Sequence, residues 1–193
     1  MNNITLVEMV MKYWEDVHAY ASLPKVSQFQ QWGPNTEEDT LTYMQQVIEN
    51  KKKDKPSRYV YAIKEVSQER IIGAAELFQI DFLNKSGEIG YIVHPDYWGK
   101  GIGTNVARQL LMIGFSEFHL HRIHATCDAR NIGSSRVLEK IGMTLEGRIR
   151  ENILLPTGWR DSLLYSILEN EWEGRKSHGT SDTRCIGTIH KGT

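Results

Sequence analysis

The stretch Trp98-Gly99-Lys100-Gly101-Ile102-Gly103-Thr104 lies between an apolar, strand-like run and a long amphipathic helix. Its three alternating glycines let several backbone N–H groups point into one small space, because no Cβ blocks the approach. The start of the helix adds unpaired amides and about half a positive charge. The stretch therefore predicts a site for a phosphate or pyrophosphate group, and a tight turn without a ligand is the alternative.

The spacing of these glycines excludes the common nucleotide sites. A P-loop needs a lysine followed by serine or threonine, whereas Lys100 is followed by Gly101. A dinucleotide-binding fingerprint needs the spacing Gly-x-Gly-x-x-Gly, whereas Gly99, Gly101 and Gly103 alternate. We therefore expect a phosphorylated ligand other than a nucleoside triphosphate or a nicotinamide dinucleotide.

Length, charge and cysteine content narrow the class of protein. A chain of 193 residues suits one domain with a sizeable core. The formal net charge of −1 favours neither nucleic acid nor a membrane surface as a partner, and Lys51-Lys52-Lys53 is interpreted as the solvated end of a helix. Cys127 and Cys185 are too few for a disulfide framework. With no signal-peptide pattern and no apolar span of about 18 residues, a cytoplasmic protein is expected.

Hydrophobic patterning in the N-terminal half predicts two helices and an antiparallel meander. A short edge strand is expected within residues 4–10 and a helix within 14–21, which ends before Pro24. Thr36 is the predicted N-cap of the next helix, because three acidic residues follow it. Three strand-like runs separated by polar turns come next, and they comprise residues 59–63, 71–78 and 88–94.

In the C-terminal half the pattern alternates between helix and strand, and a final segment has no hydrophobic periodicity. The expected elements are a helix over 102–118, a strand over 122–128, a helix over 134–141 that ends at Gly142, and strands over 144–153 and 161–168 joined by Pro156-Thr157-Gly158. We expect a folded domain over residues 1–173 and a disordered tail over 174–193.

The strand at 122–128 leads into a second motif, Asn131-Ile132-Gly133-Ser134-Ser135-Arg136-Val137-Leu138-Glu139-Lys140-Ile141-Gly142-Met143. The glycine turn and this motif, in this order and separation, resemble those of the GNAT acetyltransferases, in the branch of the ribosomal-protein N-terminal acetyltransferases. The resemblance covers about residues 4–172, including Ser22-Leu23-Pro24-Lys25-Val26 and Trp32-Gly33-Pro34. Trp98 replaces the family's Gln or Arg and Met143 its aromatic residue, and both changes are compatible with an active enzyme.

This resemblance implies an α/β fold in which helices flank a mixed, mostly antiparallel seven-stranded sheet. Two central parallel strands, here Glu88 to Val93 and residues 122–128, would splay apart and hold acetyl-CoA as the co-substrate, without a metal. Main-chain groups around Ile92 and Val93 would pair with the pantetheine arm. The other residues that the resemblance assigns to the coenzyme are Trp98, Gly99, Lys100, Gly101, Ile102, Gly103, Thr104, Asn131, Ser134 and Lys140.

Acetyl transfer from a thioester to an amine requires a base that takes a proton from the ammonium group. Glu88 and Glu151 are the candidate bases, either directly or through a bound water molecule. Each has a structural alternative, because Glu88 could be an ordinary strand residue and Glu151 could pair with Arg148 or Arg150. The sequence leaves this choice open.

The departing thiolate requires a proton or a hydrogen bond near its sulfur. Ser134 matches the family's serine beside the coenzyme sulfur, and the same hydroxyl is also well placed to cap the short helix. Asn131 is expected to hydrogen-bond the pantetheine arm, with turn formation as the alternative. Ser134 is therefore the third candidate catalytic residue, beside Glu88 and Glu151.

The histidines and cysteines point to no further chemistry. His119, His121 and His124 lie around a helix-to-strand junction without the spacing and the added carboxylate or thiolate of a metal site. Cys127 lies in an apolar strand and is interpreted as a small core residue. No metal site is therefore expected.

The favoured function is acetyl transfer from acetyl-CoA to a primary amine by direct attack in a ternary complex, with the N-terminal α-amine of a protein as an acceptor that the resemblance suggests. One alternative is acetylation of a small amine such as a polyamine, an amino acid or an aminoglycoside-like compound. The other is an acyl-CoA-binding module without catalysis. Because this family frequently dimerises, a second copy of the chain is a candidate partner.

Overall fold

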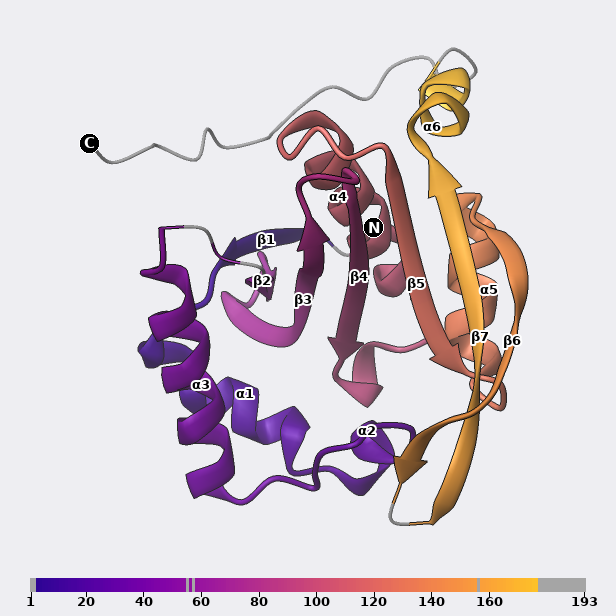
Figure 1. Ribbon diagram of the computed structural model, residues 1–193. Helices are drawn as coiled ribbons and strands as arrows, with labels where there is room; N and C mark the ends of the chain where they lie inside the picture. The colour runs from indigo at the N-terminus through magenta and orange to yellow at the C-terminus, as the bar shows by residue number, and fades with distance from the viewer. Residues whose placement is uncertain (1–2, 55, 57, 156, 177–193) are drawn as a thin grey trace.

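A computed structural model describes the backbone of residues 3–54, 56, 58–155 and 157–176, and the side chains as far as residue 172. Seven strands form one sheet in the order β1-β2-β3-β4-β5-β7-β6 (Figure 1). Neighbouring strands are antiparallel except β4 and β5, which are parallel. The strands are β1 Ile4–Glu8, β2 Arg58–Glu65, β3 Arg70–Asp81, β4 Ser86–Val93, β5 Arg122–Asp128, β6 Thr144–Leu155 and β7 Gly158–Leu168. The predicted mixed, mostly antiparallel seven-stranded sheet is confirmed.

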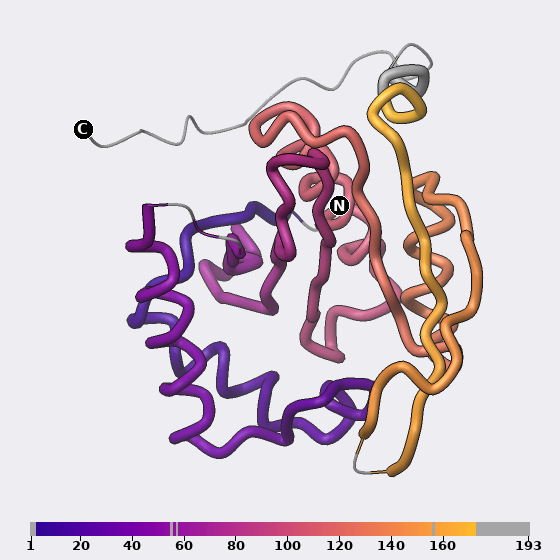
Figure 2. Tube along the Cα trace, in the orientation of Figure 1, coloured from indigo at the N-terminus to yellow at the C-terminus, as the bar shows by residue number. Residues whose placement is uncertain are grey.

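Helices precede, interrupt and follow the strands along the chain. They are η1 Met11–Tyr13, α1 Trp14–Ala21, α2 Pro24–Ser27, α3 Glu37–Lys51, η2 Pro95–Tyr97, α4 Ile102–Ser116, α5 Ile132–Ile141 and α6 Glu169–Lys176. Helix α1 packs on β3 and α3, whereas α4 packs on β3, β4 and α5. In the trace of Figure 2, the segment that holds α1, α2 and α3 runs along one end of the sheet and reaches the β6–β7 hairpin.

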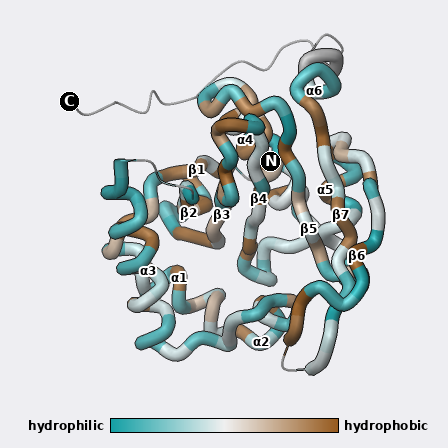
Figure 3. The backbone as a smooth tube through the Cα atoms, in the orientation of Figure 1, coloured by the Kyte–Doolittle hydropathy of each residue, from teal (hydrophilic) through white to brown (hydrophobic). Residues whose placement is uncertain are grey.

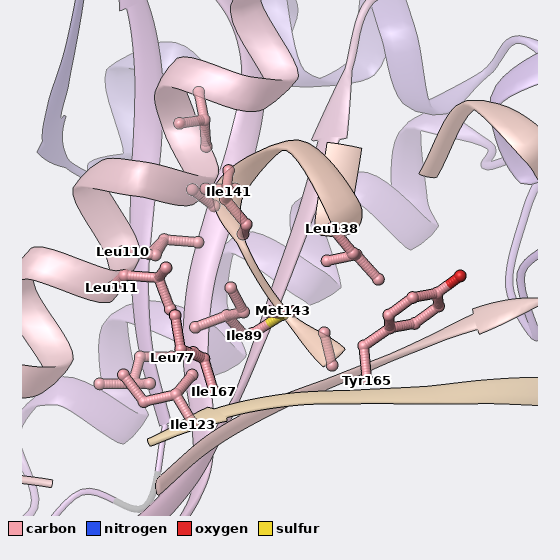
Figure 4. Packing of buried hydrophobic residues seen from close by; sticks show 14 of the residues in the cluster. Leu77, Ile89, Leu110, Leu111, Ile123, Leu138, Ile141, Met143, Tyr165 and Ile167 are labelled. Atoms are coloured by element: carbon pink, nitrogen blue, oxygen red, sulfur yellow. The ribbon is translucent and has the colours of Figure 1, made fainter. Parts of the chain in front are cut away.

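Both faces of the sheet carry a hydrophobic core, because successive strand residues point to opposite sides. Ile71 packs in a cluster with α1 and α3, whereas the adjacent Ile72 packs in a cluster with α4 and α5. Figure 4 shows Leu110 and Leu138 converging on the second of these faces, and Figure 3 shows α3 alternating between hydrophilic and hydrophobic residues. The sheet is therefore the middle layer between two layers of helices.

The parallel strands β4 and β5 separate along their length. They pair only at Ser86 with Arg122, Gly87 with Ile123 and Glu88 with His124. Beyond these pairs the two strands diverge toward their C-terminal ends, as Figure 1 shows. The expected opening between the two central strands is therefore present.

Local sequence signals account for most element boundaries. The predicted bounds of α1 and β5 agree with the structure to the residue. Thr36 caps α3 in a capping box, in which its hydroxyl accepts from the Asp39 N–H at 3.1 Å and its own N–H donates to the Asp39 carboxylate at 2.9 Å. Gly142 ends α5 in the left-handed conformation, with φ 92°.

Three differences from the sequence expectations concern helices. Helix α5 begins at Ile132, two residues earlier than expected, because Asn131 is its N-cap, and the alternative in which Ser134 caps this helix does not hold. Helix α4 ends at Ser116, two residues earlier than expected. Helix α6 was not expected and continues to Lys176, past the boundary at residue 173. Residues 177–193 and Pro156 lie outside the described residues, so the division into a domain and a disordered tail stays a prediction.

Candidate active site

A large cleft of about 540 Å³ is lined by the end of β4, the start of α4 and the loop that leads from β5 into α5. It is lined by 11 of the 12 residues that the resemblance assigned to the coenzyme, and these are Ile92, Val93, Trp98, Gly99, Gly101, Ile102, Gly103, Thr104, Asn131, Ser134 and Lys140. The exception is Lys100, whose ammonium group lies 5.2 Å from the centre of the Tyr97 ring. The expected coenzyme residues, distant in sequence, therefore share one cleft.

The glycine turn lines this cleft and leads directly into helix α4. Gly99 and Gly101 have positive φ angles of 74° and 77°, which L side chains rarely adopt. A Cβ added at either position would meet no atom within 4 Å. Gly101 is the N-cap of α4 and supplies no side-chain cap, so the first amides of the helix are available to an anion.

The end of β4 is fixed to the turn by Trp98. Its indole N–H donates to the Val93 carbonyl oxygen at 2.6 Å, and Lys25 lies 5.0 Å from the centre of the Trp98 ring. The Ile92 carbonyl points toward Gly73 on β3, where a Cβ added to the glycine would clash with it. Main-chain groups alternate in direction along a strand, so Val93 presents its main chain to the cleft and Ile92 contributes its side chain.

The lining of the cleft includes Asn131, Ser134 and Tyr91. Asn131 accepts from the Ser134 N–H at 3.1 Å, and this hydrogen bond leaves the Ser134 hydroxyl free of any capping role. The Tyr91 hydroxyl is buried and lies close to the Ser134 hydroxyl. Burial raises the pKa of Tyr91 far above its ordinary value, while the nearby Ser134 hydroxyl acts in the opposite direction. Tyr91 is therefore a protonated hydroxyl beside Ser134 at neutral pH.

A small cavity of about 200 Å³ adjoins the large cleft, and Gln30, Tyr91 and Ile92 line both. Its other lining residues are Val17, Tyr20, Ala21, Trp32, Asn35, Tyr43, Arg58, Val60, Ala74, Ala75, Glu76, Phe78 and Gly90. The only lining carboxylate among these is Glu76, whose Oε2 accepts from the Arg58 Nε at 2.6 Å. The cavity thus combines aromatic walls with one ion pair.

Glu88, the first candidate base, lies on β4 at the point where β4 and β5 separate. Glu88 is 7% exposed, and its carboxylate accepts from the Thr126 hydroxyl at 2.8 Å and lies 3.5 Å from His124 Nε2. Burial alone would raise the pKa of Glu88, but the hydrogen bonds from His124 and Thr126 and the charge of His124 lower it below its ordinary value. Glu88 is therefore ionised at neutral pH, and it lines neither the large cleft nor the small cavity.

Glu151, the second candidate base, lies in the irregular part of the β6–β7 hairpin. Its side chain is exposed, its φ angle is 48°, and its N–H donates to Asp161 Oδ1 at 2.8 Å. Arg148, which could have paired with Glu151, donates to Asp161 instead at 2.5 Å. Glu151 lines neither the cleft nor the cavity.

Arg160 joins this hairpin to the segment after α2. The arginine is 8% exposed, and its two Nη groups donate to the Phe29 carbonyl at 2.6 Å and to the Ser162 hydroxyl at 3.0 Å. Phe29 lines the large cleft. Arg160 therefore holds one wall of the cleft against β7.

Metal and cysteine chemistry were not expected at this site. Within the described part of the chain, no three His, Cys, Asp or Glu residues are grouped as metal ligands would be. Cys127 is a buried free cysteine whose Sγ lies 3.5 Å from the Ser135 hydroxyl, and burial raises the pKa of its thiol. None of the helices described is both long and apolar enough to cross a membrane.

Comparison with known proteins decides the family. Residues 3–144 match the acetyltransferase (GNAT) domain. The chain belongs to the GNAT acetyltransferase family. This GNAT enzyme is 34% identical to the N-acetyltransferase YnaD of Bacillus subtilis over 165 residues, which cover 86% of the chain and 93% of YnaD. It is also 35% identical over 106 residues to Bacillus subtilis YdaF, whose name assigns it provisionally to ribosomal N-acetylation, and these cover 55% of the chain and 58% of YdaF.

Solved structures of GNAT acetyltransferases share the fold. A Bacillus anthracis acetyltransferase of the GNAT family superposes with a TM-score of 0.77 at 32% identity, covering 87% of this chain and 96% of that one. The Microcin C7 self-immunity acetyltransferase MccE, solved with acetyl-CoA and AMP, superposes with a TM-score of 0.76 at 25% identity, covering 87% and 93%. The predicted family and enzyme class, an N-acetyltransferase, are confirmed.

Three residues at the site, Tyr91, Glu76 and Arg58, were not expected from the sequence. Tyr91 lies in an apolar strand, and its position in the sequence pattern does not distinguish it from a core residue. Glu76 is a charged residue inside the apolar run at 71–78, and that interruption was a usable signal. Arg58 pairs with Glu76 across strands and could not be placed without their register.

Proposed function

We propose that this GNAT acetyltransferase transfers an acetyl group from acetyl-CoA to a primary amine by direct attack in a ternary complex. The observation that carries the proposal is the junction of the large cleft and the small cavity at Gln30, Tyr91 and Ile92. A coenzyme in the large cleft and an amine in the small cavity would meet at this junction. Direct attack needs this proximity, because the amine must reach the thioester carbon.

The large cleft suits the coenzyme at both of its ends. The amides of the glycine turn and the first turn of α4 would bind the pyrophosphate, and Lys140 supplies a cationic side chain in the same cleft. The Val93 main chain and the Asn131 side-chain amide are placed for the pantetheine arm. In this arrangement the thioester lies beside Ser134 and Tyr91.

The chemical step would use few protein groups. The ammonium loses one proton to the base, and the amine nitrogen bonds to the thioester carbon. The C–S bond then breaks with its electron pair on sulfur, while the nitrogen loses a second proton and becomes a neutral amide. Ser134 would donate a hydrogen bond to this sulfur, and the thiolate then takes up a proton. Glu88 and Glu151 stay the proposed bases, and Glu88 would act through water because it does not line the cavity.

The first proposed acceptor is the N-terminal α-amine of a protein, and the name of the relative YdaF supports it. A small amine is the second proposal, since other relatives are named spermidine N(1)-acetyltransferases, such as that of Escherichia coli at 24% identity over 100 residues. We also propose a cytoplasmic location, because two cysteines are too few for a disulfide framework. A homodimer stays a proposal that size-exclusion chromatography can test.

The proposal is tested by incubating the purified protein with acetyl-CoA and a panel of amines and peptides. The assay measures release of the coenzyme thiol, and mass spectrometry identifies the acetylated product. We expect amine-dependent thiol release and a product heavier by one acetyl group. Tight coenzyme binding with no release across the panel would instead identify an acyl-CoA-binding module without catalysis.

A further inference from the structure

The walls of the small cavity are aromatic on several sides. Five of the residues that line it are aromatic, and these are Tyr20, Trp32, Tyr43, Phe78 and Tyr91. Val17, Val60 and Ala74 add aliphatic surface. Aromatic rings in such a wall favour an apolar group through burial of its surface and a cation through the electron-rich ring faces.

The charges in the cavity balance one another. Glu76 and Arg58 are the two charged residues that line it, and they form an ion pair at 2.6 Å. The Arg58 guanidinium also lies 5.8 Å from the centre of the Tyr43 ring. A polyamine with several positive charges would find one carboxylate here, already paired. Arg58 holds one oxygen of this carboxylate, and the other oxygen can bind one ammonium group, which favours an acceptor with a single positive charge.

The absence of a side chain at Gly90 leaves room for the Glu76 carboxylate in the cavity. Residues Glu76 and Gly90 are paired across β3 and β4, and a Cβ at Gly90 would lie 3.3 Å from Glu76 Oε1 and from a ring carbon of Phe78. Without that Cβ, Oε1 lies over β4 and stays available, while Oε2 holds Arg58. One ammonium group can therefore bind Oε1 close to Tyr91, where the thioester would lie.

The volume of the cavity limits the rest of the acceptor. A cavity of about 150 Å³ lined by apolar residues holds one benzene molecule. The small cavity, at about 200 Å³, therefore has room for one aromatic ring or a branched aliphatic group joined to the amine by a short linker. Longer parts of the acceptor would have to extend outside it.

From these observations, and resting on the proposed acetyl transfer, we propose that the acceptor is a primary amine with one positive charge and one compact apolar group of about the size of an aromatic ring. Glu76 binds the ammonium and the aromatic wall binds the apolar group. Two sources share this chemistry, a free arylalkylamine and a peptide whose N-terminal residue is aromatic or branched aliphatic.

The test compares kcat/KM for phenethylamine, ethylamine, spermidine and the tripeptides Phe-Ala-Ala and Asp-Ala-Ala, measured as thiol release. We expect phenethylamine or Phe-Ala-Ala to exceed spermidine and ethylamine by at least about tenfold, since a filled apolar pocket discriminates on this scale. A preference for Phe-Ala-Ala over phenethylamine assigns the peptide source, and the reverse assigns the free amine.

Two variants locate the effect in the cavity. Ala74→Leu fills part of the cavity and should lower the ratio of kcat/KM for phenethylamine to that for ethylamine by at least about tenfold. Glu76→Gln should raise KM for the amine by about tenfold, with the dissociation constant of acetyl-CoA unchanged. Glu49→Gln, an exposed change on α3, is the matched control for loss of one carboxylate.

The outcomes separate an error in the acceptor class from the absence of acetyl transfer. If spermidine is the best acceptor, or if Ala74→Leu lowers kcat/KM for both small and large amines equally, the acceptor class is overturned while acetyl transfer stands. If no amine or peptide is acetylated by a protein that binds acetyl-CoA, the proposed function fails and the acceptor class with it.

Discussion

One hydrogen bond between Asn131 and Ser134 decides which of the two residues caps helix α5. The Asn131 side chain accepts from the Ser134 N–H, so the asparagine caps α5, and Ser134 lines the large cleft without a capping role. Both residue types are good caps, and sequence alone left the choice open. The structural role falls to Asn131, and a role in chemistry is left to Ser134.

Replacing Ser134 with alanine should therefore separate catalysis from stability. We expect kcat to fall by about 10- to 100-fold with the acetyl-CoA dissociation constant within a few-fold, because a hydrogen bond that strengthens in the transition state affects rate more than ground-state binding. The melting temperature should stay close to that of the wild type. Asn131→Ala is the matched variant, and it should cost about 1 kcal/mol of stability through loss of the cap. Full activity of the Ser134→Ala enzyme would exclude Ser134 from the chemistry.

The ionised Glu88 predicts a pH-dependent contribution to stability. Its pKa in the folded protein lies below the ordinary value of 4.5. The carboxylate therefore stabilises the fold fully above pH 4.5, and this contribution is lost as the pH falls through the lower, folded-state pKa. Urea unfolding should show Glu88→Gln less stable than the wild type by about 1–3 kcal/mol at pH 7, with the difference shrinking in acid. A difference that grows as the pH falls would contradict this account.

Among the elements, the turn into α4 links the glycine pattern of the sequence to a backbone geometry that can bind an anion. Gly99 and Gly101 both have positive φ, and both face open space at the large cleft. The alternation of glycines in the sequence predicted this turn because positive φ is readily available only to glycine. The first amides of α4 are left uncapped as a result, which is the condition for binding an anion at a helix start.

Gly101→Val should remove this binding site. A β-branched residue is strained at φ 77°, and its side chain would lie in the cleft where the pyrophosphate belongs. Calorimetry should show a loss of about 2–4 kcal/mol in acetyl-CoA binding, since several charge-assisted hydrogen bonds are lost together. Gly147→Val is the control, because Gly147 also faces open space but lies on β6 without a positive φ. Unchanged coenzyme affinity in a folded Gly101→Val protein would place the site elsewhere.

At the scale of the whole molecule, much of the fold follows from patterning. The strand pattern at residues 122–128 and the capping residues before α3 are local signals in the sequence. They predicted β5 and the start of α3 well. The glycine turn and the Asn131 motif, which carried the resemblance, line the same cleft. The point at which β4 leaves β5, after Glu88 and His124, depends on long-range pairing that no local window of sequence contains.

Other features required the three-dimensional structure for similar reasons. Helix α6 was missed because its residues are mostly polar, and it packs through Trp172, whose ring stacks on Phe115 with centroids 6.2 Å apart. Tyr91 is indistinguishable by pattern from a core residue. Whether Glu88 lines the acceptor cavity depends on which way its side chain turns, toward Thr126 rather than toward Gly90.

Truncation tests where the folded unit ends. Deleting residues 177–193 should change the melting temperature by no more than about 2 °C, because the segment has too few apolar residues to join a core. Trp172→Ala should instead destabilise the protein by about 1–3 kcal/mol, since the ring packs against the core near Phe115. A large drop in melting temperature on truncation would show that the deleted segment packs.

The measurement that tests the central claim most directly is a crystal structure of the protein with coenzyme A. We expect pyrophosphate oxygens at about 3 Å from the backbone amides of residues 99–104. We also expect the sulfur beside the Ser134 hydroxyl, at the junction with the small cavity. Coenzyme bound outside the large cleft, or bound at the glycine turn with its thiol directed away from the small cavity, would overturn the proposed site.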